Sequence, residues 1–174
     1  MARPALTGVL LVGGASRRFG SPKALIELDG ETLHERGCRV LEAACDEVLV
    51  VGKAGELPFE VLDDGAEVRA PIAGVVAGLR AAAHDVAVFL PVDCPRVTPE
   101  LIRALGEACR DAAVPQTGPL PGAWAKSALP LLEQRLADGP FALYRTYADL
   151  DVVELDVDPA LVADVDTPGD LAGL

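Results

Sequence analysis

The sequence predicts an α/β fold, a three-layer α/β/α sandwich around a mainly parallel, Rossmann-like sheet. Three observations lead to this class. Short apolar runs rich in valine and leucine alternate with longer amphipathic stretches through the first two thirds of the chain. The runs carry few polar residues, as in strands that are buried on both faces. Such alternation of strands and helices favours parallel strands with helices on both faces of one sheet.

The composition fits one ordered domain over residues 1–174. Hydrophobic residues make up 51% and charged residues 24%, so the chain can bury a core. The net charge of -12 argues against nucleic acid and anionic membranes as partners. The cysteines, at 38, 45, 94 and 109, show no C-x-x-C pairing, so we expect reduced core residues. The N-terminal segment is too short for a signal peptide and no run reaches the roughly 20 apolar residues of a spanning helix, so we expect a cytoplasmic protein.

The elements follow from local patterns. Apolar runs predict strands at 9–12, 48–51, 59–62 and 86–93, and the last of these is the expected central strand. Residues 24–28 form a short strand or turn before Asp29-Gly30. A helix is expected from Thr32, and another opens at Pro71 and runs to about residue 83. In that helix Gly74 and Gly78 lie on one face, either for close packing on the sheet or for the approach of a ligand.

The second half of the chain contributes further elements. Thr98-Pro99 is typical of a helix start, and this helix continues to about residue 110. We expect a strand near Val114, an edge strand at 122–125, helices at 127–136 and 141–147, a strand at 151–155, and a short helix after Pro168.

The loop after the first strand is suited to polyphosphate binding. Arg17, Arg18 and Lys23 follow the strand closely, and residues 8–26 contain none of the chain's 27 acidic residues. Backbone amides and cations together form a site for anions. The spacing is not that of a P-loop, because Gly20 is not followed by Lys-Ser or Lys-Thr. It is not a dinucleotide fingerprint either, because the first two glycines are contiguous.

The stretch from Leu11 to Lys23 resembles the signature L-x-G-G-x-x-x-R-[MF]-G-x-x-K of nucleotidyltransferases. More narrowly, it is similar to the molybdenum cofactor guanylyltransferase family, with Val12 for the usual alanine and Phe19 for the usual methionine. The resemblance implies a fold of the nucleotide-diphospho-sugar transferase type. The alternative is a basic turn after a core strand.

Asp93 is the second candidate site residue, as a ligand for a metal ion. It follows the expected central strand between Pro91 and Pro95, and a hard carboxylate oxygen there suits Mg²⁺. The segment resembles the family's metal-binding x-x-D-x-P motif. The alternative is an ordinary aspartate in a turn.

A third segment, Asp164-Val165-Asp166-Thr167-Pro168, resembles the family's N-x-N-T-P motif with aspartates in place of both asparagines. The same change occurs in related cytidylyl-transferring members. The resemblance suggests Asp166 as a second metal ligand, whereas its simpler role would be to cap the last helix. The extra negative charge could tighten metal binding or indicate a different substrate.

The resemblance also implies roles for further residues. Arg18 would neutralise the β- and γ-phosphates, Lys23 would bridge the α-phosphate and the acceptor phosphate, and Asp93 would hold Mg²⁺. Together with Lys23 and Asp93, the implied nucleotide-binding residues are Leu11, Val12, Gly13, Gly14, Ala15, Gly52, Asp64, Pro71 and Gly74. Asp63 is the alternative to Asp64 for this nucleotide-binding role. The loops that contain most of these residues follow strands, so we expect them to line one crevice at the carboxyl edge of the sheet.

The implied reaction is transfer of GMP from GTP to molybdopterin with Mg²⁺, which releases pyrophosphate. A CTP-dependent enzyme, another small phosphorylated acceptor, and a noncatalytic nucleotide-binding module are the alternatives. We expect a monomer that makes transient contact with molybdoenzymes or cofactor-insertion proteins. Trp124 departs from the family's pterin-side segment, so it either stacks on a heterocycle or packs in the core.

Overall fold

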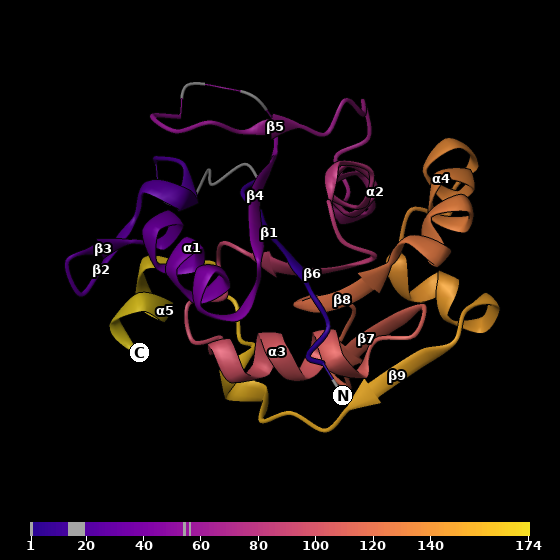
Figure 1. Ribbon diagram of the computed structural model, residues 1–174. Helices are drawn as coiled ribbons and strands as arrows, with labels where there is room; N and C mark the ends of the chain where they lie inside the picture. The colour runs from indigo at the N-terminus through magenta and orange to yellow at the C-terminus, as the bar shows by residue number, and fades with distance from the viewer. Residues whose placement is uncertain (1, 14–19, 54, 56) are drawn as a thin grey trace.

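The computed structural model describes residues 2–13, 20–53, 55 and 57–174. In this part of the chain, seven strands form one sheet in the order β5-β4-β1-β6-β8-β7-β9 (Figure 1). The strands of this sheet are β1 (Thr7–Leu11), β4 (Glu47–Gly52), β5 (Leu62–Asp63), β6 (Val86–Pro91), β7 (Ala112–Pro115), β8 (Gly122–Ala125) and β9 (Val152–Leu155). A separate hairpin joins β2 (Glu27–Leu28) and β3 (Glu31–Thr32).

The sheet is mixed but mainly parallel. β1 pairs in parallel with β4 and with β6, so Leu10 lies between Val50 and Leu90. β4 and β5 are parallel, as are β7 and β9. Only β8 runs against its neighbours within the described sheet, since it is antiparallel to both β6 and β7. The prediction of a mainly parallel sheet is confirmed, and β6 is its central strand.

Helices cover both faces of the sheet, which makes the predicted three-layer sandwich (Figure 1). On one face α1 (Leu33–Ala44) packs against α3 (Pro99–Ala108), and on the other α2 (Pro71–Ala81) packs against α4 (Leu129–Asp138). A separate apolar core lies under each pair. The remaining helices are short: η1 (Lys23–Leu25), η2 (Lys126–Ala128), η3 (Leu143–Asp149), η4 (Pro159–Leu161) and α5 (Pro168–Ala172).

The helices begin where the sequence places their caps. The Thr32 hydroxyl accepts a hydrogen bond from the Glu35 amide at 3.1 Å, and the Glu35 carboxylate accepts one from the Thr32 amide at 2.8 Å. This reciprocal pair satisfies two amides at the start of α1. Thr98 caps α3 before Pro99, and Pro71 occupies the first turn of α2.

Gly74 and Gly78 allow α2 to lie close to the sheet. A Cβ atom on Gly78 would come within 2.6 Å of the Phe89 ring, and one on Gly74 within 2.8 Å of the Leu11 side chain. Neither approach is possible for a residue with a side chain. Close packing, one of the two alternatives for this glycine pair, is therefore what the structure shows.

Three local predictions need correction. The strand at 122–125 is not at the edge, because β8 lies between β6 and β7 and all its residues are buried. Pro119 and Pro121, which are typical of a loop or an edge, lie in the turn between β7 and β8. The helix expected at 141–147 is the 3-10 helix η3, which begins after Gly139-Pro140. Of the strand expected at 59–62, only Leu62 joins β5.

Candidate active site

Loops at the carboxyl edge of the sheet bring the predicted residues together. The Val12 amide donates to Val51 O at 3.0 Å, and the Val92 amide donates to Leu11 O at 3.0 Å. These bonds extend the pairing of β1 with β4 and β6 just beyond the end of β1. The segment that leads into Gly13 is therefore held between the ends of its two neighbours.

Gly52 brings the end of β4 against the loop after β1. A Cβ atom on Gly52 would lie 3.0 Å from the Gly13 nitrogen and 3.0 Å from a methyl carbon of Val12. The Asp64 amide donates to Gly52 O at 2.9 Å, which holds the residue after β5 beside the same point. Gly13, Gly52 and Asp64 thus lie along one stretch of the edge, as expected for a common crevice.

Lys23 pairs with two aspartates at the same edge. Its Nζ lies 3.0 Å from Asp93 Oδ2 and 2.8 Å from Asp166 Oδ1. The Lys23 side chain is only 18% exposed and that of Asp93 24%, so solvent screens this pair incompletely. Partial burial alone would lower the pKa of Lys23, but hydrogen bonds to Asp166 and Asp93 outweigh it and the pKa is raised. The amine is therefore a cation at neutral pH.

A third carboxylate joins this group. Oxygen atoms of Asp93, Asp164 and Asp166 all lie within 4.8 Å of one another. The Val165 amide donates to Asp93 O at 2.8 Å, and the buried Val165 side chain anchors the segment. Carboxylate oxygens are the ligands that Mg²⁺ and related hard cations prefer, so this donor set fits a divalent metal.

The structure corrects the simpler role given to Asp166. Thr167, and not Asp166, caps α5, and its partner in the capping box is Asp170. The Asp170 carboxylate also accepts a hydrogen bond from the Asp166 amide at 2.9 Å. The backbone around residue 166 is thereby fixed while its carboxylate points to Lys23. Sequence reasoning missed Asp164 as a partner, although the alternating D-V-D pattern places both carboxylates on the same side of a buried valine.

Asp64 has a cationic partner that the sequence did not indicate. Lys53 Nζ lies 2.5 Å from Asp64 Oδ1 and also bonds to the carbonyl oxygen of Ala66. The neighbouring Asp63 instead accepts from the Gly65 amide at 2.7 Å and is more exposed. Lys53 therefore holds the loop that contains Asp64 against the end of β4. A single lysine directly after a strand has no sequence pattern that indicates this pairing.

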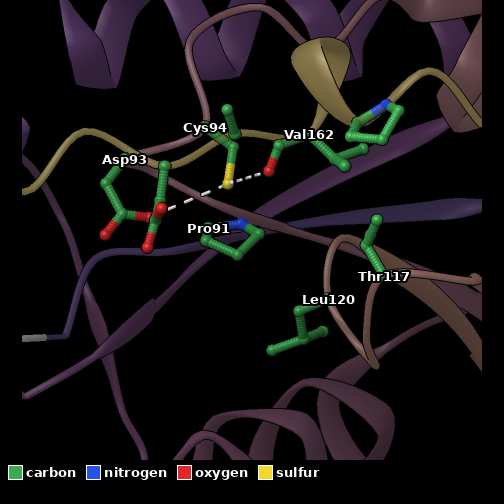
Figure 2. Close-up of a pocket in the computed structure, with 9 residues that line it drawn as sticks. Pro91, Asp93, Cys94, Thr117, Leu120 and Val162 are labelled. Atoms are coloured by element: carbon green, nitrogen blue, oxygen red, sulfur yellow. Dashed lines mark hydrogen bonds between the residues drawn. The ribbon is translucent and has the colours of Figure 1, made fainter. Parts of the chain in front are cut away.

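A hollow of about 330 Å³, here called the Asp93 hollow, opens beside Asp93 (Figure 2). Its lining combines apolar side chains with polar groups, and Asp93 and Asp164 supply its charges. The Cys94 thiol points toward the Asp93 carboxylate, 3.9 Å away, and burial raises its pKa. The lining residues are Pro91, Asp93, Cys94, Thr117, Leu120, Pro159, Val162, Ala163 and Asp164.

The remaining predicted residues fall into three groups. Gly14, Ala15 and Arg18 lie outside the described residues. Pro71 and Gly74 are in the first turns of α2, and Gly74 packs against the Leu11 side chain. Trp124 is fully buried, so packing, and not stacking on a ligand, is the correct alternative for it.

Two further expectations concern the whole molecule. All four cysteines are free, as predicted. Among the described residues, no helix combines the length and apolar character required to cross a bilayer.

Comparison with known proteins agrees with this geometry. The chain matches the family model of the MobA-like NTP transferase domain over residues 8–155. Two proteins named "probable molybdenum cofactor guanylyltransferase" are similar to it. The one from Opitutus terrae is 37% identical, over 84% of this chain and 79% of its own. The one from Chloroflexus aggregans is 34% identical over 67% of this chain, and the match spans only 61% of that protein.

Among solved structures, the molybdopterin-guanine dinucleotide biosynthesis protein A of Archaeoglobus fulgidus superposes with a TM-score of 0.80 at 25% identity, over 96% of this chain and 95% of its own. The fold, the carboxyl-edge site and the family match over most of the chain lead to one conclusion. This chain belongs to the MobA-like NTP transferase domain family and is a nucleotidyltransferase.

Proposed function

We propose that the protein transfers GMP from GTP to the phosphate of molybdopterin, forming the guanine dinucleotide cofactor and releasing pyrophosphate. The observation that carries this proposal is the contact of Lys23, the last residue of the nucleotidyltransferase signature, with Asp93 at the carboxyl edge. The names of the relatives supply the substrates.

Two anions must meet in this reaction, because the acceptor phosphate attacks the α-phosphorus of a triphosphate. The main task of the protein is orientation and charge neutralisation. Lys23 is suited to this task because its ammonium contacts Asp93, which lines the Asp93 hollow. In our proposal it bridges the α-phosphate and the acceptor phosphate, while Arg18 of the signature neutralises the leaving pyrophosphate.

The three carboxylates would hold the metal ion. Bound Mg²⁺ supplies positive charge that polarises the phosphate for attack. Asp93 is the best placed ligand, since it follows the central strand and faces both the Lys23 ammonium and the hollow. Asp166 and Asp164 complete a set of hard oxygen donors. Without the metal, the Lys23 ammonium balances part of their negative charge.

The nucleotide and the acceptor occupy different parts of the edge in this proposal. The nucleotide lies along Val12, Gly13, Gly52 and Asp64, where β1, β4 and β5 end. The acceptor enters through the Asp93 hollow, where β6 ends. This arrangement places both phosphates beside Lys23.

A specific observation favours a second candidate, a CTP-dependent cytidylyltransferase acting on the same acceptor. Asp164 and Asp166 stand where the guanylyltransferase pattern has asparagines, and aspartates occur there in cytidylyl-transferring relatives. The two activities share the chemistry and differ in the base that is read.

The deciding experiment measures pyrophosphate release with molybdopterin, Mg²⁺ and either GTP or CTP. We expect release with GTP and formation of the guanine dinucleotide, with little release when the acceptor is omitted. Faster release with CTP would establish the second candidate. Binding of a nucleotide without release on this acceptor or on other small phosphorylated acceptors would contradict both and indicate a noncatalytic binding module.

A further inference from the structure

A second hollow continues along the carboxyl edge beyond the Asp93 hollow. It measures about 310 Å³ and lies between the 115–119 turn, η3 and β9. Thr117 lines both hollows, so they are neighbours on either side of that residue. We call this second site the tyrosine hollow and define it by Pro115, Thr117, Pro119, Tyr144, Tyr147 and Glu154.

Two tyrosines give this hollow its chemistry. Tyr144 is 56% exposed, which is high for an aromatic ring, and the Arg145 guanidinium lies over it at 5.4 Å from the ring centroid. The Tyr147 hydroxyl is buried and has no hydrogen-bond partner in the described part of the chain. Burial, with a smaller effect of Glu154, raises the pKa of Tyr147 to about 12, so the hydroxyl stays protonated at neutral pH. This oxygen has almost no accessible surface, so Tyr147 contributes to the wall of the hollow but offers no donor to a ligand there.

The walls of the hollow are held rigidly. The Trp124 ring, fully buried in β8, lies 6.5 Å from the Tyr147 ring and supports it from the core side. Gln116 fixes the turn, because its side chain bonds to both the carbonyl oxygen and the amide of Val157, at 2.7 and 2.9 Å. A concave site with aromatic walls and a few fixed polar groups is typical of small-ligand binding. Trp124, the departure from the family pattern, thus shapes this hollow without touching a ligand.

We propose that the tyrosine hollow binds the planar heterocycle of the acceptor substrate, at the end remote from the phosphate. Tyr144 offers a ring for stacking. The exposed Glu154 carboxylate also lines the hollow and can accept a hydrogen bond from an N–H or amino group at the edge of the heterocycle. This inference rests on the proposed function, in which the acceptor phosphate lies beside Lys23, and a reduced pterin has the required ring edge.

Direct binding of 6-hydroxymethylpterin tests the site without any transfer reaction. Trp124 is the only tryptophan in the chain, so its fluorescence reports on ligands that approach Tyr147. We expect saturable quenching in the wild type and, because stacking on an aromatic ring is lost, about tenfold weaker binding in Tyr144→Ala. Glu154→Ala removes the carboxylate acceptor and should weaken binding about fivefold. Phe141→Ala removes another exposed aromatic ring that does not line the hollow, so its binding should equal that of the wild type.

The transfer assay separates this inference from the proposed function. If Tyr144→Ala raises the KM for molybdopterin and leaves the KM for the nucleotide unchanged, both stand. If the wild type transfers GMP but the Tyr144→Ala and Glu154→Ala variants bind pterin and acceptor normally, the inference is wrong and the function remains. If the pterin quenches Trp124 in a Tyr144-dependent way but no nucleotide is transferred to molybdopterin, the proposed function fails and the hollow is a heterocycle site for another acceptor. Absence of pterin binding to the wild type overturns the inference.

Discussion

The amino edge and the carboxyl edge of the main sheet both carry carboxylates but surround them differently. At the amino edge, Glu47 accepts hydrogen bonds from the buried Thr7 hydroxyl at 2.6 Å and from the Ala83 amide at 2.9 Å. Asp46 accepts one from the Leu6 amide at 2.9 Å. At the carboxyl edge, oxygen atoms of three carboxylates lie within 4.8 Å of one another beside the ammonium of a lysine.

The amino edge therefore contributes to stability, and the carboxyl edge is suited to function. Neutral donors at the amino edge satisfy each carboxylate and join β1, β4 and the end of α2, which stabilises the fold. Carboxylates crowded at the carboxyl edge repel one another, which costs stability but prepares a site for cations and phosphates. Substitutions at the carboxyl edge should therefore change activity more than stability, and those at the amino edge the reverse.

The largest effect is expected for Lys23→Ala. It removes the cation between the two phosphates, and loss of one such contact typically costs about 10²–10³ in rate. We expect this fall in kcat/KM in the pyrophosphate assay, with a melting temperature close to that of the wild type. Arg110→Ala, which breaks an ion pair with Asp151 before β7, is the matched control and should keep full activity. Near-normal turnover of Lys23→Ala would remove the proposed mechanism.

Gly52→Ala tests the contact between the ends of β1 and β4. The new methyl group would have to displace Gly13 or Val12, and such overpacking costs about 1–3 kcal/mol. We expect a higher KM for the nucleotide, an unchanged KM for the acceptor, and a lower free energy of unfolding in urea. Gly169→Ala, where the nearest atom is 3.6 Å away, should change none of these. An equal rise in both KM values would place the nucleotide elsewhere.

Asp164→Asn should affect metal binding and stability in opposite directions. Removing one of the three charges should raise the Mg²⁺ concentration for half-maximal activity about tenfold. The same change relieves repulsion, so the melting temperature without Mg²⁺ should rise. Asp156→Asn removes an exposed charge outside the group and should do neither. An unchanged Mg²⁺ requirement would exclude Asp164 from the metal site.

The smallest effect is expected at the amino edge, for Glu47→Gln. Hydrogen bonds from Thr7 and from the Ala83 amide hold the pKa of Glu47 below its usual 4.5. The stability that it contributes is complete above that pH and is lost as pH falls through the lowered folded-state pKa. We expect the variant to melt about 2–4 °C lower at pH 7, with a difference that shrinks under acid, and to keep full activity.

Glu60→Gln is the control for that experiment, because Glu60 is exposed. Thermal unfolding followed by circular dichroism between pH 3 and pH 7 provides the measurement. A difference between Glu47→Gln and wild type that stays constant over this range would show that the carboxylate charge contributes nothing at the amino edge.

Much of the site could be predicted because its residues follow buried strands. Val9 to Val12 and Val86 to Val92 have the apolar character of central parallel strands, and the ends of such strands meet at one edge. It was therefore predictable that Lys23 and Asp93 lie near each other. The position of Asp164 in the same group could not be predicted. It depends on the hydrogen bond from the Val165 amide to the carbonyl oxygen of Asp93, which lies 72 residues earlier in the chain.

The second half of the chain was harder to interpret. β8 is short and directly follows a proline, which favours an edge strand, yet it lies inside the sheet and runs against its neighbours. Burial of Trp124 and pairing on both sides override the local signals. Lys53 was missed because an isolated lysine after a strand carries no pattern, and only the return of the chain through β5 gives it Asp64 as a partner.

The sequence by itself determined the class of the fold, the starts of the main helices and the family signature, since these depend on residues close together along the chain. Tertiary structure alone decided the direction and place of β8, the grouping of three carboxylates around Lys23, and the hollow walled by Tyr144 and Tyr147. The physical reason is that periodicity and capping are local, whereas the register of a sheet and the partners of a charged side chain depend on which distant segments pack together.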